Sequence, residues 1–262
     1  MVTIGIDPIL FSIGHFMIRW YSLIILMAIV IGTSLVVREA ERRGFKSEDI
    51  YDSLLWILIA GLIGARLFHV FDHWHEFSLQ PVRILFLWEG GLAIWGAVAG
   101  GLIAAAILAW RKGWRLPRFL DAAAPGVVLG QAIGRIACVI TGDAMGKPTS
   151  GPFGFAYTSP HALVPQLGVY YTPMPIYELV GNLAIFVLLW KLHKKNWPDG
   201  LLFLTYLILY SIERFFLAFT SSYQIMVFGL TQSQVVALIS LAIAIPLVLH
   251  TLRRRIVVSS LR

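Results

Sequence analysis

The chain has 262 residues, of which 58% are hydrophobic and 13% are charged, and its formal net charge is +7. Soluble domains average about 45–50% apolar and about 25% charged residues, so this composition excludes an ordinary water-soluble domain and indicates lipid as the solvent. The basic residues lie in short clusters between apolar runs, which is typical of membrane topology signals and argues against nucleic-acid binding.

Seven apolar runs are long enough for a helix to cross a hydrocarbon core of about 30 Å. They are Phe16–Val37, Ser53–Phe71, Leu92–Trp110, Phe119–Ile140, Pro175–Leu192, Gly200–Phe219 and Gln232–Leu252. We therefore predict an all-α integral membrane protein, a seven-transmembrane-helix bundle in which residues 1–262 form a single domain.

The basic residues between the runs predict how this bundle is oriented. Fifteen of the 21 basic residues follow the first, third and fifth runs or lie in the tail, whereas only Arg83 and Lys147 lie in the opposite connections. Because basic residues concentrate on the cytoplasmic side, the N-terminus is predicted to face outside and the C-terminus to be cytoplasmic.

The longest connection on the outer side covers residues 141–174, between the fourth and fifth runs. It is rich in glycine and proline, which favour ordered turns and short strands, with Phe153–Tyr157 and Val169–Tyr171 as the strand candidates. A connection of this length on a small bundle is typically functional. We predict that it forms a small extracytoplasmic head.

Four arginines lie inside predicted runs: Arg19, Arg66, Arg135 and Arg214. A charge at membrane depth requires a partner or a wet cavity, although Arg19 is close enough to a helix end to snorkel. Arg135 and Arg214 each lie about five residues from an outer end, and a pair of arginines there suits a phosphodiester. The acidic residues in or next to the runs are Asp121, Glu178, Glu213 and Asp143.

Two other polar features have simpler interpretations than chemistry. His69, Asp72, His73 and Glu76 share one helical face and could bind zinc, but polar residues at headgroup level are the simpler reading, and no metal site is predicted. The only cysteine, Cys138, excludes an internal disulfide and is interpreted as a packing residue and not as a nucleophile.

The run from Gly134 to Gly146, GRIACVITGDAMG, resembles the signature G-R-x-G-N-F-x-N-G-E-x-x-G of the bacterial prolipoprotein diacylglyceryl transferase family. The signature arginine falls on Arg135, its acid on Asp143, and its glycines on Gly134, Gly142 and Gly146. Five further segments resemble the family in order and spacing: Arg19-Trp20-Tyr21, Gly64-Ala65-Arg66, Trp88-Glu89-Gly90-Gly91-Leu92, Pro173-Met174-Pro175-Ile176-Tyr177-Glu178 and Tyr210-Ser211-Ile212-Glu213-Arg214.

The resemblance implies a multi-pass transferase of the bacterial cytoplasmic (inner) membrane. Such an enzyme moves the diacylglyceryl group of phosphatidylglycerol onto the lipobox cysteine of a preprolipoprotein, the first step of lipoprotein maturation, without a metal or soluble cofactor. Arg135 and Arg214 would stabilise the leaving phosphate, and Tyr21 and Tyr210 would position it. Asp143 would orient the loop or an arginine. The substrate-binding set would be Arg135, Arg66, Gly134, Gly142, Gly146, Trp95 and Glu178, with Glu178 paired to an internal arginine such as Arg66.

The sequence departs from the family pattern at four positions. Trp95 stands where many relatives have histidine, Cys138 replaces the signature asparagine, Asp143 replaces its glutamate, and Ala218 replaces an acid four residues after Arg214. The phosphate itself, Asp143 and Glu178 are the candidate proton acceptors. These departures leave two alternatives open: a lipid-binding homologue without transferase activity, and a small anion transporter with the two arginines in its pathway.

Overall fold

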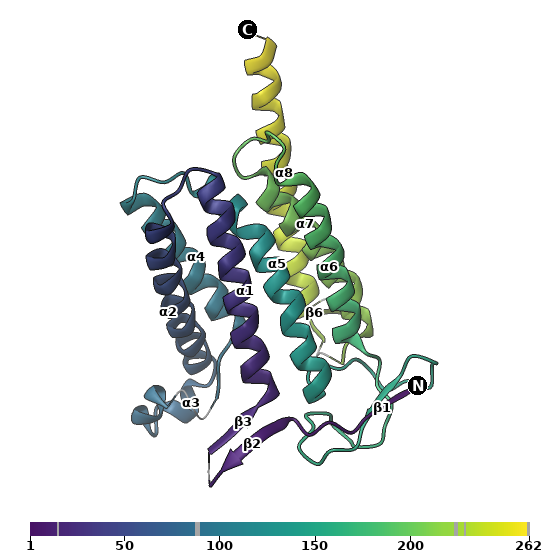
Figure 1. Ribbon diagram of the computed structural model, residues 1–262. Helices are drawn as coiled ribbons and strands as arrows, with labels where there is room; N and C mark the ends of the chain where they lie inside the picture. The colour runs from purple at the N-terminus through teal and green to yellow at the C-terminus, as the bar shows by residue number, and fades with distance from the viewer. Residues whose placement is uncertain (15, 87–89, 223–224, 228, 261–262) are drawn as a thin grey trace. The chain divides into compact units, whose positions relative to one another are not determined.

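A computed structural model describes the chain except residues 15, 87–89, 223–224, 228 and 261–262 (Figure 1). The described part is mostly helical and includes seven helices long and apolar enough to cross a membrane. The long helices are α1 (Trp20–Arg42), α2 (Ser47–Asp72), α4 (Ile94–Arg111), α5 (Leu116–Thr141), α6 (Met174–Leu192), α7 (Leu201–Leu217) and α8 (Gln232–Ser260). Short turns of helix lie at α3 (Trp74–Phe77), η1 (Pro81–Leu85) and η3 (Ala218–Thr220). The predicted fold class, seven apolar helices of a multi-pass membrane protein, is confirmed.

The chain forms two compact units. Unit one comprises Met1–Val36 and Asp121–Arg262, and unit two comprises Val37–Leu120. In unit two, α2 packs against α4 through glycines. A Cβ on Gly96 would collide with the carbonyl oxygen of Gly64, and one on Gly100 with that of Ala60. Gly101 differs, because a Cβ there would meet only the Ile57 side chain, at 3.7 Å.

This difference gives a matched pair of variants. Gly100→Ala should destabilise the α2–α4 packing by about 1–3 kcal/mol, because the added methyl group meets backbone atoms that cannot move aside cheaply. Gly101→Ala should be nearly neutral. Thermal unfolding of both variants in detergent measures the difference, and equal stabilities would show that the helices do not pack as closely as described.

The core of unit one lies between α5, α6 and α7. Its fully packed members are Ala124, Val128, Ile185, Leu189, Leu202 and Tyr206. The buried Asp121 carboxylate accepts hydrogen bonds from the backbone N–H groups of Gly200, at 2.9 Å, and Phe203, at 2.8 Å. These groups begin α7, so Asp121 satisfies the unpaired donors of that helix start and complements its dipole. Asp121 therefore has a structural role.

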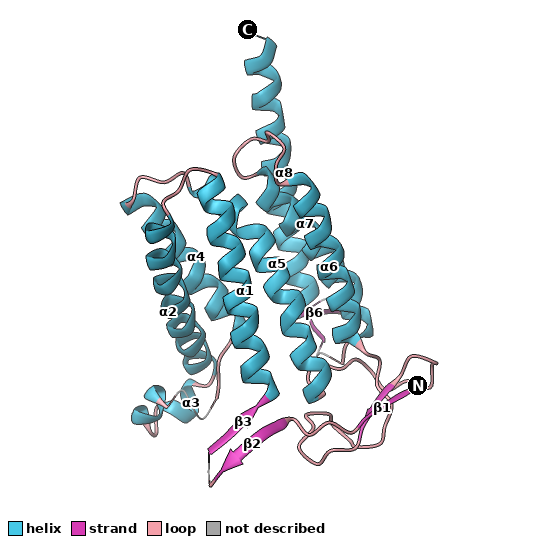
Figure 2. Ribbon diagram, viewed as in Figure 1, coloured by secondary structure: helices cyan, strands magenta, loops and turns pink. Residues whose placement is uncertain are grey.

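Residues 142–173 and the N-terminal segment lie together at one end of unit one, while the connection between α6 and α7 lies at the other end (Figure 1). The strand β1 (Val2–Ile4) pairs in parallel with β4 (Phe155–Tyr157), with Val2 opposite Phe155 (Figure 2). Tyr171 forms bridges to Phe155 and Pro148. The candidate Phe153–Tyr157 is thus correct in place but shorter than predicted, whereas Val169–Tyr171 forms only the bridges of Tyr171. We name residues 142–173 the head segment.

The first helix begins four residues later than predicted. Residues Phe16–Arg19 form β3, which pairs antiparallel with β2 (Ile9–Ile13), and α1 begins at Trp20. A second short hairpin joins β5 (Ile225–Val227) to β6 (Leu230–Thr231) before α8. The error at Phe16–Arg19 has a physical reason, because a short apolar run does not distinguish a strand from the start of a helix.

Candidate active site

One carboxylate joins three helices of unit one. Glu178, in the second turn of α6, is 2% exposed, and its two oxygens form ion pairs with Arg135 of α5 and Arg214 of α7. Glu178 lies four positions after the start of its span, and Arg135 and Arg214 each lie six positions before the end of theirs. At 1.5 Å per residue, the cluster lies about 6–9 Å inside these ends of the helices.

Arg135 combines this ion pair with open donors. Its Nε contacts Glu178, its Nη1 lies 3.8 Å from the Cys138 sulfur, and the side chain is 24% exposed. Among the described residues, its Nη2 makes no hydrogen bond. Sulfur is a weak acceptor, so Arg135 keeps N–H groups that an anion could bind. This geometry fits the predicted role of Arg135 and gives Cys138 a packing position beside it.

Glu178 pairs with internal arginines, as predicted, but these are Arg135 and Arg214 and not the suggested Arg66, because the two occupy both oxygens of Glu178. Arg66 belongs to unit two, where its five N–H groups donate to backbone carbonyls. The acceptors are the carbonyl oxygens of Ile84, Gly90, Gly91, Arg83 and Phe86, at 2.5–3.2 Å. No donor of Arg66 is left for a phosphate in this conformation. Spacing along α2 could not reveal these acceptors, because all of them lie in the following connection.

Arg66→Met should therefore loosen the connection between α3 and α4. The variant leaves the carbonyl groups of that connection without a charged donor, and hydrogen bonds to charged groups contribute about 1.5–3 kcal/mol each. We expect a loss of at least about 2 kcal/mol in stability and faster proteolysis within residues 78–93. Arg83→Met is the control, since the Arg83 side chain is not one of these donors. Unchanged proteolysis of Arg66→Met would contradict the role.

The signature run forms the end of α5 and the start of the head segment. Gly142 has a φ of +75°, and its N–H donates to the Cys138 carbonyl at 2.9 Å, which closes the helix in the left-handed conformation that favours glycine. The Asp143 carboxylate then accepts from the Ala144 N–H at 2.8 Å. A Cβ on Gly146 would lie 2.5 Å from the Thr220 carbonyl oxygen. These residues shape the turn, whereas a Cβ on Gly134 would meet only the end of the Ile25 side chain, at the ordinary contact distance of 3.5 Å.

The two predicted tyrosines also lie beside the cluster. Tyr21, the second residue of α1, is 39% exposed and lies within electrostatic range of Cys138, Asp143 and Arg135. Tyr210 lies one helical turn before Arg214 and stacks on Tyr206, with ring centroids 5.8 Å apart. The structure thus brings together the signature run, Tyr21, Glu178 and the Tyr210–Arg214 segment from four helices.

Two polar residues near the cluster were not singled out from the sequence. Asn182 lies one turn after Glu178 on α6 and is 1% exposed. Gln131 lies one turn before Arg135 on α5, and its side-chain oxygen accepts from the Tyr206 hydroxyl at 3.1 Å. The sequence offered the same signal for both residues. Each is an amide side chain four residues from a charged residue, in a helix that is otherwise apolar.

The remaining residues singled out from the sequence do not belong to the cluster of unit one described above. Trp95 is half-buried at the second position of α4 in unit two, so its contact with substrate stays a prediction. Trp88 and Glu89 lie outside the described residues. The rings of His69 and His73 stack at 4.3 Å, and no described group of three or more His, Cys, Asp or Glu side chains is placed to hold a metal ion.

The head segment has its own polar contacts and a small pocket. Burial raises the pKa of Tyr157, whose hydroxyl donates to the Val139 carbonyl oxygen at 2.6 Å.

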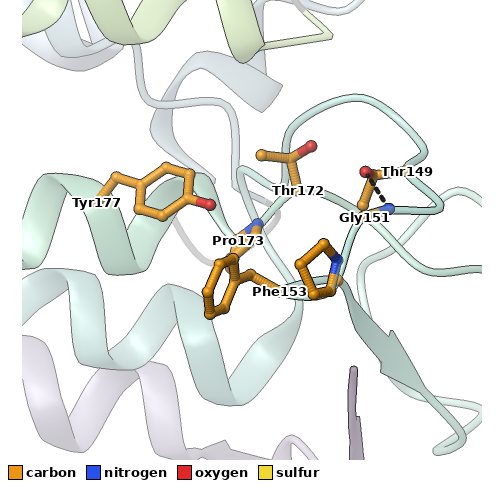
Figure 3. A pocket seen from close by; sticks show the side chains of 8 residues that line it. Thr149, Gly151, Phe153, Thr172, Pro173 and Tyr177 are labelled. Atoms are coloured by element: carbon orange, nitrogen blue, oxygen red, sulfur yellow. Dashed lines mark hydrogen bonds between the residues drawn. The ribbon is translucent and has the colours of Figure 1, made fainter.

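A pocket of about 90 Å³ lies where the segment meets α6, and Figure 3 shows Tyr177, Phe153 and Thr172 around it. Ligand pockets for drug-sized molecules are about 300–1,000 Å³, so this pocket is too small for a phospholipid.

The comparisons with known proteins identify the family of this chain. The family model described as prolipoprotein diacylglyceryl transferase matches residues 8–250. Curated relatives bear the name phosphatidylglycerol–prolipoprotein diacylglyceryl transferase. One from Dehalococcoides mccartyi is 36% identical over 97% of both chains. One from Lactobacillus delbrueckii subsp. bulgaricus is 35% identical over 97% of this chain and 93% of its own, and one from Halalkalibacterium halodurans is 35% identical over 81% and 74%. The chain therefore belongs to the prolipoprotein diacylglyceryl transferase family.

Proposed function

We propose that this chain transfers the diacylglyceryl group of phosphatidylglycerol to the thiol of a lipobox cysteine in a preprolipoprotein. The observation that carries the proposal is the pair of arginines held on Glu178 beside the signature run, in a chain whose relatives are named for this reaction. A pair of guanidinium groups suits a phosphodiester, which presents several oxygens to their planar donors.

In the reaction, the cysteine sulfur bonds to C3 of the glycerol, and the C3–oxygen bond to phosphate breaks. The thiol loses its proton, and negative charge grows on the phosphate that leaves with the headgroup glycerol. That phosphate is the proposed acceptor of the proton, so glycerol phosphate leaves with it. Donors already aimed at that phosphate stabilise the transition state more than the ground state. We assign this work to Arg135 and Arg214, with Tyr21 and Tyr210 as hydrogen-bonding positioners of the phosphate.

Glu178 is best assigned to holding the arginines, because a proton on its carboxylate would weaken both ion pairs at once. Asp143 is assigned to the turn that follows α5, where it accepts from the Ala144 N–H. The sulfur of the new thioether comes from the substrate, so Cys138 has no chemical step to perform. Trp95 is proposed as a substrate contact.

The proposed location is the bacterial cytoplasmic membrane, with the head segment outside and the C-terminus inside. The bias of basic residues supports this orientation. The pairing of β1 with β4 supports a shared side for the N-terminus and the head segment, because four spanning helices separate these strands along the chain. An even number of crossings returns the chain to the side on which it started.

The test is to incubate the purified protein with phosphatidylglycerol and a lipobox peptide and to search for a thioether-linked diacylglyceryl peptide by mass spectrometry. The expected result is one diacylglyceryl group per peptide cysteine and release of glycerol phosphate. Lipid binding without thioether would indicate a lipid-binding homologue. Anion flux in proteoliposomes without thioether would indicate a transporter, and either outcome would end the proposal.

A further inference from the structure

Glu213 takes no part in the ion pairs described above. It lies on α7 next to Arg214, and both of its carboxylate oxygens are buried without a hydrogen-bond partner among the described residues. The carboxylate rests against Gly181 of α6, where a Cβ would collide with its Oε1. The site for this carboxylate therefore exists because position 181 has no side chain. An unpaired buried carboxylate is costly as an anion, so this site suits a carboxyl group that carries a proton.

The charged and titratable groups around Glu213 come from three helices. Arg135 of α5 lies within electrostatic range of it, and Glu178 of α6 holds both arginines. Tyr206, Tyr210 and Arg214 share its own helix. The remaining neighbour, α8, has no titratable residue before His250. The region thus contains two guanidinium groups and two carboxyl groups, with both guanidinium groups on one carboxylate.

Counting these charges shows what happens when an anion binds. With Glu178 and Glu213 both ionised, the four groups are neutral in total, and a phosphodiester would leave an excess negative charge at membrane depth. With a proton on Glu213, the same groups sum to one positive charge, which the phosphodiester neutralises. Uncompensated charge at this depth costs several kcal/mol in general, so the protonated form of Glu213 favours the anion.

We infer that Glu213 is a proton-carrying positioning residue of the donor-lipid site, which must hold a proton while Arg135 and Arg214 bind the phosphodiester. The inference rests on the proposed function, since it takes the arginine pair as the phosphate site. No covalent bond changes in this step. The phosphodiester keeps its single negative charge, and Glu213 takes one proton from solution wherever it is ionised in the lipid-free protein.

The test is titration calorimetry of the full-length protein in detergent with dihexanoyl phosphatidylglycerol, from about pH 5 to about pH 9. Measurement in two buffers of different ionisation enthalpy counts the protons taken up on binding. For the wild type, we expect affinity to fall by about tenfold per pH unit on the alkaline limb, with proton uptake rising there toward one per lipid. Affinity should be level on the acid limb, where Glu213 already holds its proton.

Glu213→Gln fixes the side chain in a neutral form of nearly the same shape. This variant should keep the acid-limb affinity of the wild type at every pH and take up no proton. Glu41→Gln is the control, because Glu41 is an exposed acid near the end of α1, and its pH profile should match the wild type.

Two outcomes would overturn the inference and leave the proposed function standing. One is wild-type binding without proton uptake at any pH, a measurement that needs no variant to fold. The other is a Glu213→Gln protein that keeps the pH dependence of the wild type. If the wild type bound the lipid no more tightly than Arg135→Ala at every pH, the proposed phosphate site and the inference would both fall.

Discussion

Replacing Glu178 by glutamine should cause the largest loss of stability of any single substitution near the site. Glu178 is 2% exposed, and its carboxylate is shared by Arg135 and Arg214. Removing one partner of a buried ion pair costs about 3–5 kcal/mol, because the remaining charge loses its compensation. We expect Glu178→Gln to unfold at a much lower temperature in detergent and to show almost no diacylglyceryl transfer.

Asp52→Asn is the matched control for Glu178→Gln, because it also removes a carboxylate that pairs with a basic side chain. Asp52 lies 3.1 Å from the Lys112 ammonium group, but its side chain is 54% exposed, so its loss should cost less than about 1 kcal/mol. A double-mutant cycle between Glu178→Gln and Arg214→Gln should give a coupling energy above about 1 kcal/mol. Wild-type stability of Glu178→Gln would show that the arginines do not depend on this carboxylate.

Arg135→Ala should reduce the transfer rate by at least about 100-fold, the usual effect of removing one charge-stabilising donor from a preorganised site. The protein should stay folded, because Arg214 remains paired with Glu178. Arg135→Lys keeps the charge but loses the planar fork, so its rate should lie between those of the wild type and Arg135→Ala. The measurement is the initial rate of thioether formation, with thermal stability in detergent beside it.

A purely structural role for Arg135 predicts the opposite pattern. Arg135→Ala would then misfold, while Arg135→Lys would transfer at nearly the wild-type rate. Arg42→Ala is the control, since Arg42 also pairs with a buried glutamate, Glu39. This pair lies at the C-terminal end of α1, whereas Tyr21 lies at its N-terminal end. Transfer at the wild-type rate by folded Arg135→Ala would remove Arg135 from the chemistry.

The sequence predicted the seven spans to within six residues at each end, because apolar length alone decides whether a helix can cross a bilayer. The error at Phe16–Arg19 fell where the span is preceded by a hairpin whose residues are equally apolar. Hydropathy indicates which residues are buried in lipid or protein, but it does not distinguish a helical backbone from an extended one. The division of the chain into two units also has no signature in composition.

The site was predictable as a set of residues but not as a set of contacts. Charged residues in apolar helices identified Arg135, Arg214 and Glu178, since each requires a partner. Which charges pair depends on helix rotation and packing, and Arg66 was assigned to Glu178 for lack of that information. The site for Glu213 depends on Gly181, a glycine on another helix whose significance is visible only when the two are placed together.

The parallel pairing of β1 with β4 has a consequence for biosynthesis. Val2 and Phe155 face each other across the pair, although about 150 residues separate them. At about 5–20 residues per second, the ribosome makes β4 about 8–30 s after β1. During that interval four spans are inserted while β1 waits with its backbone groups unpaired. Closure of the head is therefore a late step of synthesis, and the nascent chain depends on water or a chaperone to keep that strand edge from other partners.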